Sequence, residues 1–148
     1  MLSVKDRTAG LNRLVRGELS AVETYRQALD KLKDAPEATE LHALMVEHRT
    51  AAQSLREHVK QRGGDAADGS GPWGTWAKFV EGAAKMFGTA AALKALKEGE
   101  QHGIDEYESF LEDQNADEEC KELVRARLLP QAHSHVPILD RLIDKQQK

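Results

Sequence analysis

A short segment with the spacing of one helix face occurs twice in this chain. Residues 17–29 read GELSAVETYRQAL, and residues 99–111 read GEQHGIDEYESFL. In each copy a glycine precedes a glutamate, and a β-branched residue, a tyrosine and a leucine follow that glutamate by four, seven and eleven residues. Steps of three and four residues place side chains on one face of an α-helix. The sequence therefore predicts two helices of similar design that pack against other helices.

The same spacing extends over four segments of the chain. We expect a first helix over about residues 11–32 and a second that follows the break at residues 33–36 and ends at the glycines at 63–64. A third helix should span about residues 89–111. The fourth should begin near Asn115, because this residue and the glutamate three positions later have the spacing of a capping box.

The inward-facing side chains of each helix follow from this spacing. In chain order, the four predicted stripes are Leu11, Val15, Glu18, Val22, Tyr25, Leu29 and Leu32; Leu41, Met45, His48, Ala52, Leu55 and Val59; Leu93, Leu96, Glu100, Ile104, Tyr107 and Leu111; and Val124, Leu128, Gln131, His135, Ile138 and Leu142. Pro130 and Pro137 lie inside the fourth helix, and each removes a backbone hydrogen bond. We expect that helix to be kinked or interrupted.

Together these segments predict one all-α domain over residues 1–148, a four-helix bundle of two repeated antiparallel hairpins. The hairpins should span about residues 10–62 and 89–146. The crossover between them, about residues 63–88, should contain a short helix. It carries Trp73, Trp76 and Phe79, which we expect to pack on the bundle or to contact a protein partner or a second copy of the chain.

Composition excludes several classes of function. The net charge is -4 and the basic residues are scattered among acidic ones, which is not the pattern of a nucleic-acid-binding surface. No apolar run approaches the roughly 20 residues that a membrane span requires. The chain has one cysteine and begins without the basic and apolar regions of a signal peptide. We therefore expect a cytoplasmic protein that binds neither nucleic acid nor a membrane.

Polar residues interrupt the apolar stripes at positions that should be buried. They are Glu18, His48, Glu100, Gln131 and His135. A buried carboxylate without a partner is costly, so these acids require each other, a cation or a metal ion. Carboxylate oxygens and imidazole nitrogens together suit zinc, iron or manganese. The candidate metal ligands are Glu18, Glu100, His48 and His135, with support from Glu47, His133 or Gln131. Only one of His133 and His135 can face inward, because they are two residues apart on a helix.

Several motifs resemble a known superfamily. The two GE…Y…L segments, LREHVKQRGG at 55–64, the tryptophan-bearing crossover and LLPQAHSHVPILDRL at 128–142 resemble the ferritin-like superfamily. More narrowly, they resemble a bacterial family of ferritin-like four-helix bundles classed as a domain of unknown function. Ferritin-like di-iron proteins take one glutamate from each of two helices and an E-x-x-H pair from each of the others. The resemblance implies that Glu18 and Glu100 match the single glutamates. Where the E-x-x-H pairs should be, this chain has Glu47 with Thr50 and Gln131 with Ser134.

Two functions of different classes follow. In the first, the protein has no enzymatic activity and no catalytic residues, the polar layer is structural, and the outer surface or the crossover binds a partner or another copy. The resemblance implies an association with stress. In the second, the protein binds iron, zinc or manganese as a di-metal carboxylate protein with oxidase or metal-handling activity. The missing E-x-x-H pairs favour the first function.

Overall fold

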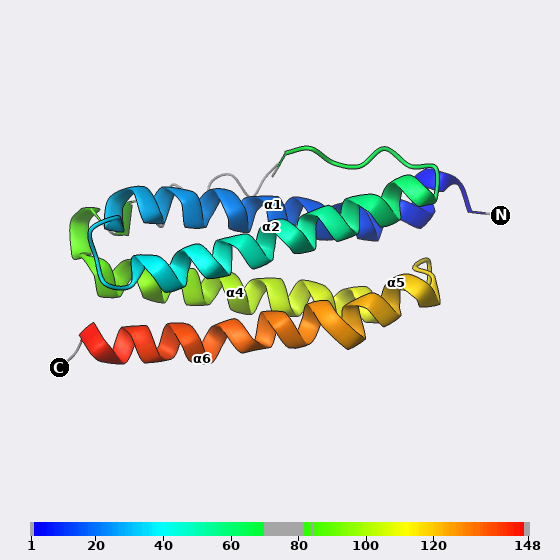
Figure 1. Ribbon diagram of the computed structural model, residues 1–148. Helices are drawn as coiled ribbons and strands as arrows, with labels where there is room; N and C mark the ends of the chain where they lie inside the picture. The colour runs from blue at the N-terminus through cyan, green and yellow to red at the C-terminus, as the bar shows by residue number, and fades with distance from the viewer. Residues whose placement is uncertain (1, 70–81, 84, 147–148) are drawn as a thin grey trace.

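A computed structural model of the protein describes residues 2–69, 82–83 and 85–146. Four long helices lie side by side: α1 (Val4–Leu32), α2 (Ala38–Gln61), α4 (Thr89–Leu111) and α6 (Leu129–Gln146) (Figure 1). The short helix α5 (Glu118–Leu123) and the π-helical segment η2 (Val124–Leu128) lead into α6. The described residues contain no strand. The prediction of an all-α protein is confirmed.

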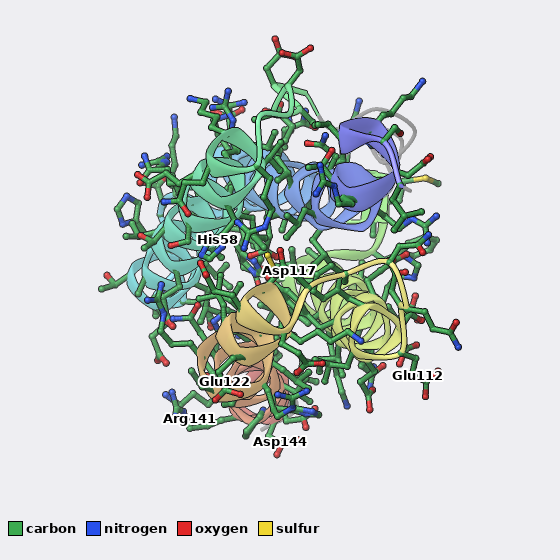
Figure 2. The ribbon with its side chains drawn as sticks, turned by 90° about the vertical axis from the view of Figure 1, so that its right-hand side faces the viewer. His58, Glu112, Asp117, Glu122, Arg141 and Asp144 are labelled. Atoms are coloured by element: carbon green, nitrogen blue, oxygen red, sulfur yellow. The ribbon has the colours of Figure 1, made fainter. Side chains whose placement is uncertain are left out.

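The helices form two antiparallel pairs. α1 pairs with α2, and α4 pairs with α6 (Figure 1). Viewed from the end, the α1–α2 pair lies over the α4–α6 pair, and α1 faces α4 (Figure 2). α2 ends at one end of the bundle and α4 begins at the other (Figure 1). The predicted contact residues Trp73, Trp76 and Phe79 lie outside the described residues.

The start of the first helix differs from the prediction. α1 begins at Val4, well before Leu11, because Ser3 and Asp6 form a capping box. The Ser3 hydroxyl oxygen accepts the Asp6 backbone N–H at 3.0 Å, and Asp6 accepts the Ser3 backbone N–H. This S-x-x-D spacing is visible in the sequence and could have located the first turn.

The other predicted helix ends are partly right. α2 ends at the expected glycines: Gly63 has a φ of 78° and donates its N–H to Lys60, while Gly64 donates to Val59. This is the Schellman arrangement, in which glycine takes the left-handed conformation. α5 is capped by Asp117, whose side chain accepts the N–H of Cys120, so Asn115 is not the cap.

The π-helical turn changes the inward face of the last helix. Pro130 lies two residues after the end of η2, and a proline ring clashes with the carbonyl four residues before it, which here belongs to η2. The wider π turn relieves this crowding and adds a residue to the turn. As a result Ala132 and Leu139 are buried, whereas the predicted Gln131 and Ile138 are only half-buried. α6 continues as a helix through Pro137, which lies on its exposed side.

Two apolar clusters fill the bundle, one toward each end. One contains Tyr25, Leu41, Leu96 and Leu139, and the other contains Leu14, Leu55, Ile104 and Leu128. In every long helix a buried polar residue lies between the residues of one cluster and those of the other. These residues are Glu18 in α1, His48 in α2, Glu100 in α4 and His135 in α6. The core is therefore divided by one polar layer. None of the described helices is long and apolar enough to cross a membrane.

Candidate metal centre

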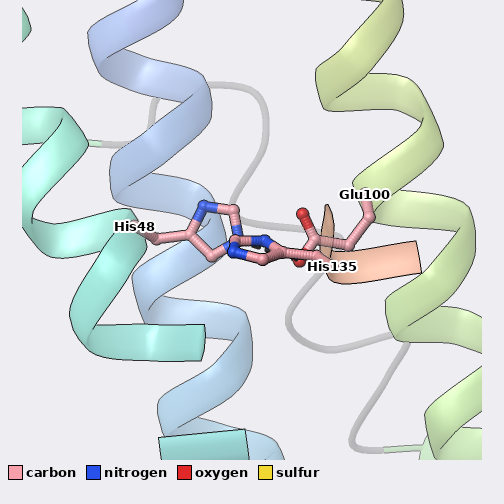
Figure 3. A group of neighbouring side chains, drawn as sticks. All are labelled: His48, Glu100 and His135. Atoms are coloured by element: carbon pink, nitrogen blue, oxygen red, sulfur yellow. Dashed lines mark hydrogen bonds and ion pairs between the residues drawn. The ribbon is translucent and has the colours of Figure 1, made fainter. Parts of the chain in front are cut away.

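The polar layer is organised around one oxygen atom of Glu100. Its Oε2 accepts the Tyr25 hydroxyl at 2.6 Å and lies 2.9 Å from Nε2 of His48 and 3.0 Å from Nδ1 of His135. The side chains of His48, Glu100 and His135 converge from three helices (Figure 3). One ligand atom from each of these three residues lies within 4.8 Å of the others.

Each histidine also contacts a second carboxylate through its other nitrogen. Nδ1 of His48 lies 3.1 Å from Oε1 of Glu18, and Nε2 of His135 lies 3.4 Å from Oε1 of Glu47. Glu18 is buried, whereas the Glu47 side chain is 37% exposed. The layer is thus a chain of alternating carboxylates and imidazoles across the bundle. The orientation of each ring is fixed from both sides.

The electrostatics favour a charged His48 and an ionised Glu100. Burial alone would lower the pKa of His48, but the charges of Glu100 and Glu18 and their hydrogen bonds outweigh it and raise that pKa well above its ordinary value. Burial alone would raise the pKa of Glu100. The charge of His48 and the hydrogen bonds from His135 and His48 instead hold the pKa of Glu100 well below its ordinary value. In the absence of a metal, a proton on each nitrogen of His48 satisfies Glu18 and Glu100.

Two buried tyrosines border this layer. Burial, followed by the charge of Glu100, raises the pKa of Tyr25 well above its ordinary value, so the hydroxyl stays protonated and donates to Glu100. Burial, followed by the charge of Glu18, likewise raises the pKa of Tyr107. Although Glu18 is near, the Tyr107 hydroxyl has no hydrogen bond of normal geometry to any described residue. The two tyrosines of the repeated segments therefore differ: Tyr25 donates to Glu100, and the Tyr107 hydroxyl is near Glu18 without a well-formed hydrogen bond to the described residues.

A cavity of about 320 Å³ lies between α1 and α4 and reaches the polar layer. Its walls are largely apolar, with Leu14 and Ala21 on α1 and Leu96 on α4. Its polar inner wall includes Glu18, Tyr25, His48, Glu100 and Tyr107. This volume is at the lower end of the range for small-molecule pockets. The candidate metal centre is therefore beside a space that a small molecule can enter.

The predicted site residues are distributed as follows. Glu18, His48, Glu100 and His135 meet in the layer, and Glu47 contacts it from the outside. His133 is exposed, and Gln131 is half-buried with no side-chain hydrogen bond to the cluster among the described residues. Regular helical spacing already places His135 inward, and the π turn moves Gln131 aside.

The arrangement can hold either protons or a metal ion. Ligand atoms on one zinc ion lie at most about 4 Å apart, because zinc bonds to nitrogen and oxygen are about 2.0–2.2 Å long. The three inner atoms are within 4.8 Å of one another, so small side-chain movements would bring them to bonding distance. Two histidines and one carboxylate are also the ligands of catalytic zinc sites and of non-haem iron(II) sites that keep open positions.

Comparison with known proteins supplies a family but no activity. A family model described as "Domain of unknown function (DUF2383)" matches residues 6–113, which is most of the chain. Glu18, His48 and Glu100 lie within the matched residues, and His135 lies after them. No curated protein and no solved structure matches the chain.

Proposed function

We propose that this chain, which belongs to the family described as a domain of unknown function (DUF2383), binds one divalent transition-metal ion. The ligands are Nε2 of His48, Oε2 of Glu100 and Nδ1 of His135. The ion takes the place of the protons that these nitrogens otherwise share with Glu100. Zinc and ferrous iron both fit two imidazoles and one carboxylate.

The observation that carries this proposal is the position of the second carboxylates. Histidines that bind a metal through one nitrogen commonly donate the other N–H to a carboxylate, which fixes the ring and strengthens the ligand. His48 has Glu18 in this position at 3.1 Å, and His135 has Glu47 at 3.4 Å. The Tyr25 hydroxyl supports Glu100 in the same way. These contacts would keep both rings in place while the inner nitrogens hold the ion.

We also propose that the bundle is ferritin-like and consists of two repeated hairpins. In support, Glu18 and Glu100 occupy matching positions of the two repeated segments and both reach the same layer. The E-x-x-H pairs of di-iron proteins are missing, since Thr50 and Ser134 stand in the histidine positions and are exposed. This donor set favours a single ion over a di-metal centre. Three protein ligands leave open positions, which suit oxidase-type or metal-handling activity.

A zinc titration tests the proposal. We expect the protein, stripped of metal with a chelator and freed of any purification tag, to bind one equivalent of zinc by isothermal titration calorimetry. The exposed His133 provides a matched control: His133→Ala should bind zinc as the parent does. Absence of zinc and iron(II) binding by the parent would leave the polar layer as a structural network and refute the proposal.

The outer carboxylates provide a second prediction. Glu47→Gln should weaken zinc binding by roughly 10- to 100-fold, because it replaces the charged carboxylate beside the outer His135 nitrogen with a neutral amide while leaving every ligand in place. Glu108→Gln, at an exposed position of α4, serves as the control and should leave the affinity unchanged. The zinc dissociation constant of each variant is the measurement. Equal affinities for Glu47→Gln and Glu108→Gln would show that Glu47 has no part in the site.

A further inference from the structure

The cavity between α1 and α4 owes its space to glycines inside helices. Gly17 in α1 and Gly103 in α4 line it, and a Cβ atom placed on either would meet no atom of the described residues within 4 Å. Gly10 is different: a Cβ there would lie 3.2 Å from the Phe110 ring, so that glycine allows close packing. Glycine in a helix interior is unfavourable relative to alanine. Close packing against the described part of the chain does not account for Gly17 and Gly103, and what they provide there is open space.

The inner end of this cavity carries the hydroxyl of Tyr107. Tyr107 lines the cavity, is 3% exposed, and has a hydroxyl with no hydrogen bond of normal geometry to the described residues. Buried polar groups normally have a well-formed hydrogen bond. The Tyr107 hydroxyl, with Glu18 near it and open space beside it, therefore points to a molecule that supplies a better acceptor. Glu100 and His48 lie on the same wall.

The charges around the cavity limit what it can accept. Glu18 and Glu100 at the inner end and Glu98 and Glu106 near the mouth oppose the entry of an anion. Arg13 and His102 line the cavity as well, so it is not a strongly acidic site for a cation. Most of the wall is apolar, formed by leucine and alanine side chains. The best fit is an uncharged molecule with an apolar body and a single polar end.

We propose that this cavity binds a small neutral molecule with one carbonyl or hydroxyl oxygen. The apolar body lies along Leu14 and Leu96, and the oxygen accepts the Tyr107 hydroxyl at the inner end, beside the ligands of the metal. The molecule's position relative to an open coordination site rests on the proposed metal binding. The binding of the molecule in the cavity and its hydrogen bond with Tyr107 do not rest on metal binding.

Fluorine NMR with 4-fluoroacetophenone, a carbonyl probe of about ten non-hydrogen atoms, tests this proposal. We expect saturable broadening of its signal by the parent protein, in both metal-free and zinc-loaded samples. Gly103→Leu should fill the cavity and abolish the effect. Ala43→Leu adds the same side chain at an exposed position of α2 and should leave binding unchanged. No binding by the parent, or equal binding by Gly103→Leu, would overturn the proposal.

The role of the hydroxyl is tested separately with Tyr107→Phe. This variant should weaken 4-fluoroacetophenone binding about fivefold, the size of one neutral hydrogen bond. Binding of 4-fluorotoluene, which has no oxygen, should not change. If both probes lose affinity equally, the hydroxyl does not recognise the oxygen and the class of ligand proposed here is wrong.

Zinc binding by the same samples separates the two proposals. Gly103→Leu changes no ligand, so it should still take up zinc. If the parent binds the probe but not zinc or iron(II), the proposed function fails and the cavity proposal stands. If the parent binds zinc but not the probe, the cavity proposal fails alone.

Discussion

Glu100→Ala should lower the free energy of unfolding of the metal-free protein by about 3–5 kcal/mol, as expected when one member of a buried ion pair is removed. Oε2 of Glu100 is the shared acceptor of Tyr25, His48 and His135, and Glu100 is only 4% exposed. The substitution leaves donors from three helices without their acceptor. Unfolding in urea, followed by circular dichroism, measures the change.

Two further variants serve as controls for this measurement. Glu108→Ala removes an exposed glutamate from the same helix and should change stability by no more than about 0.5 kcal/mol. Glu100→Gln keeps an oxygen of similar position but loses the charge, so it should be more stable than Glu100→Ala and yet fail to bind zinc. A loss of less than 1 kcal/mol in Glu100→Ala would mean that the polar layer does not hold the helices together.

The second large effect that we predict is on the pH dependence of stability, which a bound metal ion should reverse. The pKa of His48 is raised above its ordinary 6.5, so its contribution to stability is fully present below that pH and is lost as pH rises through the folded-state pKa. The pKa of Glu100 is lowered from 4.5, so its contribution is present above that pH and is lost as pH falls through the folded-state pKa. Together these two contributions to the stability of the metal-free protein should be greatest between about pH 4.5 and 6.5.

The stability that zinc adds should instead increase as the pH rises. The ion needs the unprotonated Nε2 of His48, so zinc affinity should rise about tenfold per pH unit below the folded-state pKa of this residue. At a free zinc concentration of 100 times the dissociation constant, the ion adds about 2.7 kcal/mol of stability. Urea unfolding with chelator and with zinc, at pH 6 and pH 8.5, measures both trends.

A histidine substitution tests the assignment of this pH dependence. In metal-free protein, the decline of stability above pH 6.5 should disappear in His48→Gln and persist in His133→Gln, which changes an exposed residue. A decline that is the same in parent and His48→Gln would show that a different group titrates. The charged state assigned to His48 would then be wrong.

The sequence predicts much of this architecture because helix packing imposes a strict spacing. A glutamate at a position that should be apolar is conspicuous, and the polar residues Glu18, His48, Glu100 and His135 are indeed buried and in contact. Counting residues from the turns places Glu18 and His48 on levels several ångströms apart along the bundle. Their atoms nevertheless lie 3.1 Å apart, because residue counting includes neither the stagger of helices nor the reach of side chains.

Other features depend on information that spacing does not contain. The half-buried position of Gln131 follows from the π turn before Pro130, which shifts the register of the last helix. The partners of the outer nitrogens depend on side-chain rotamers across two helices. The cavity depends on how two helices pack beside Gly17 and Gly103, and the residue pattern of a single helix cannot show this. Local periodicity therefore predicts the layer, and only the packed structure shows its connections.

Anomalous X-ray diffraction at the zinc absorption edge tests the central claim most directly. For crystals of the protein grown with one equivalent of zinc, we predict a single peak at about 2.0–2.2 Å from Nε2 of His48, Oε2 of Glu100 and Nδ1 of His135. In such crystals the outer nitrogens of His48 and His135 should still be hydrogen-bonded to Glu18 and Glu47, respectively. A zinc peak at exposed residues only, with His48 and His135 still hydrogen-bonded to Glu100, would contradict the account.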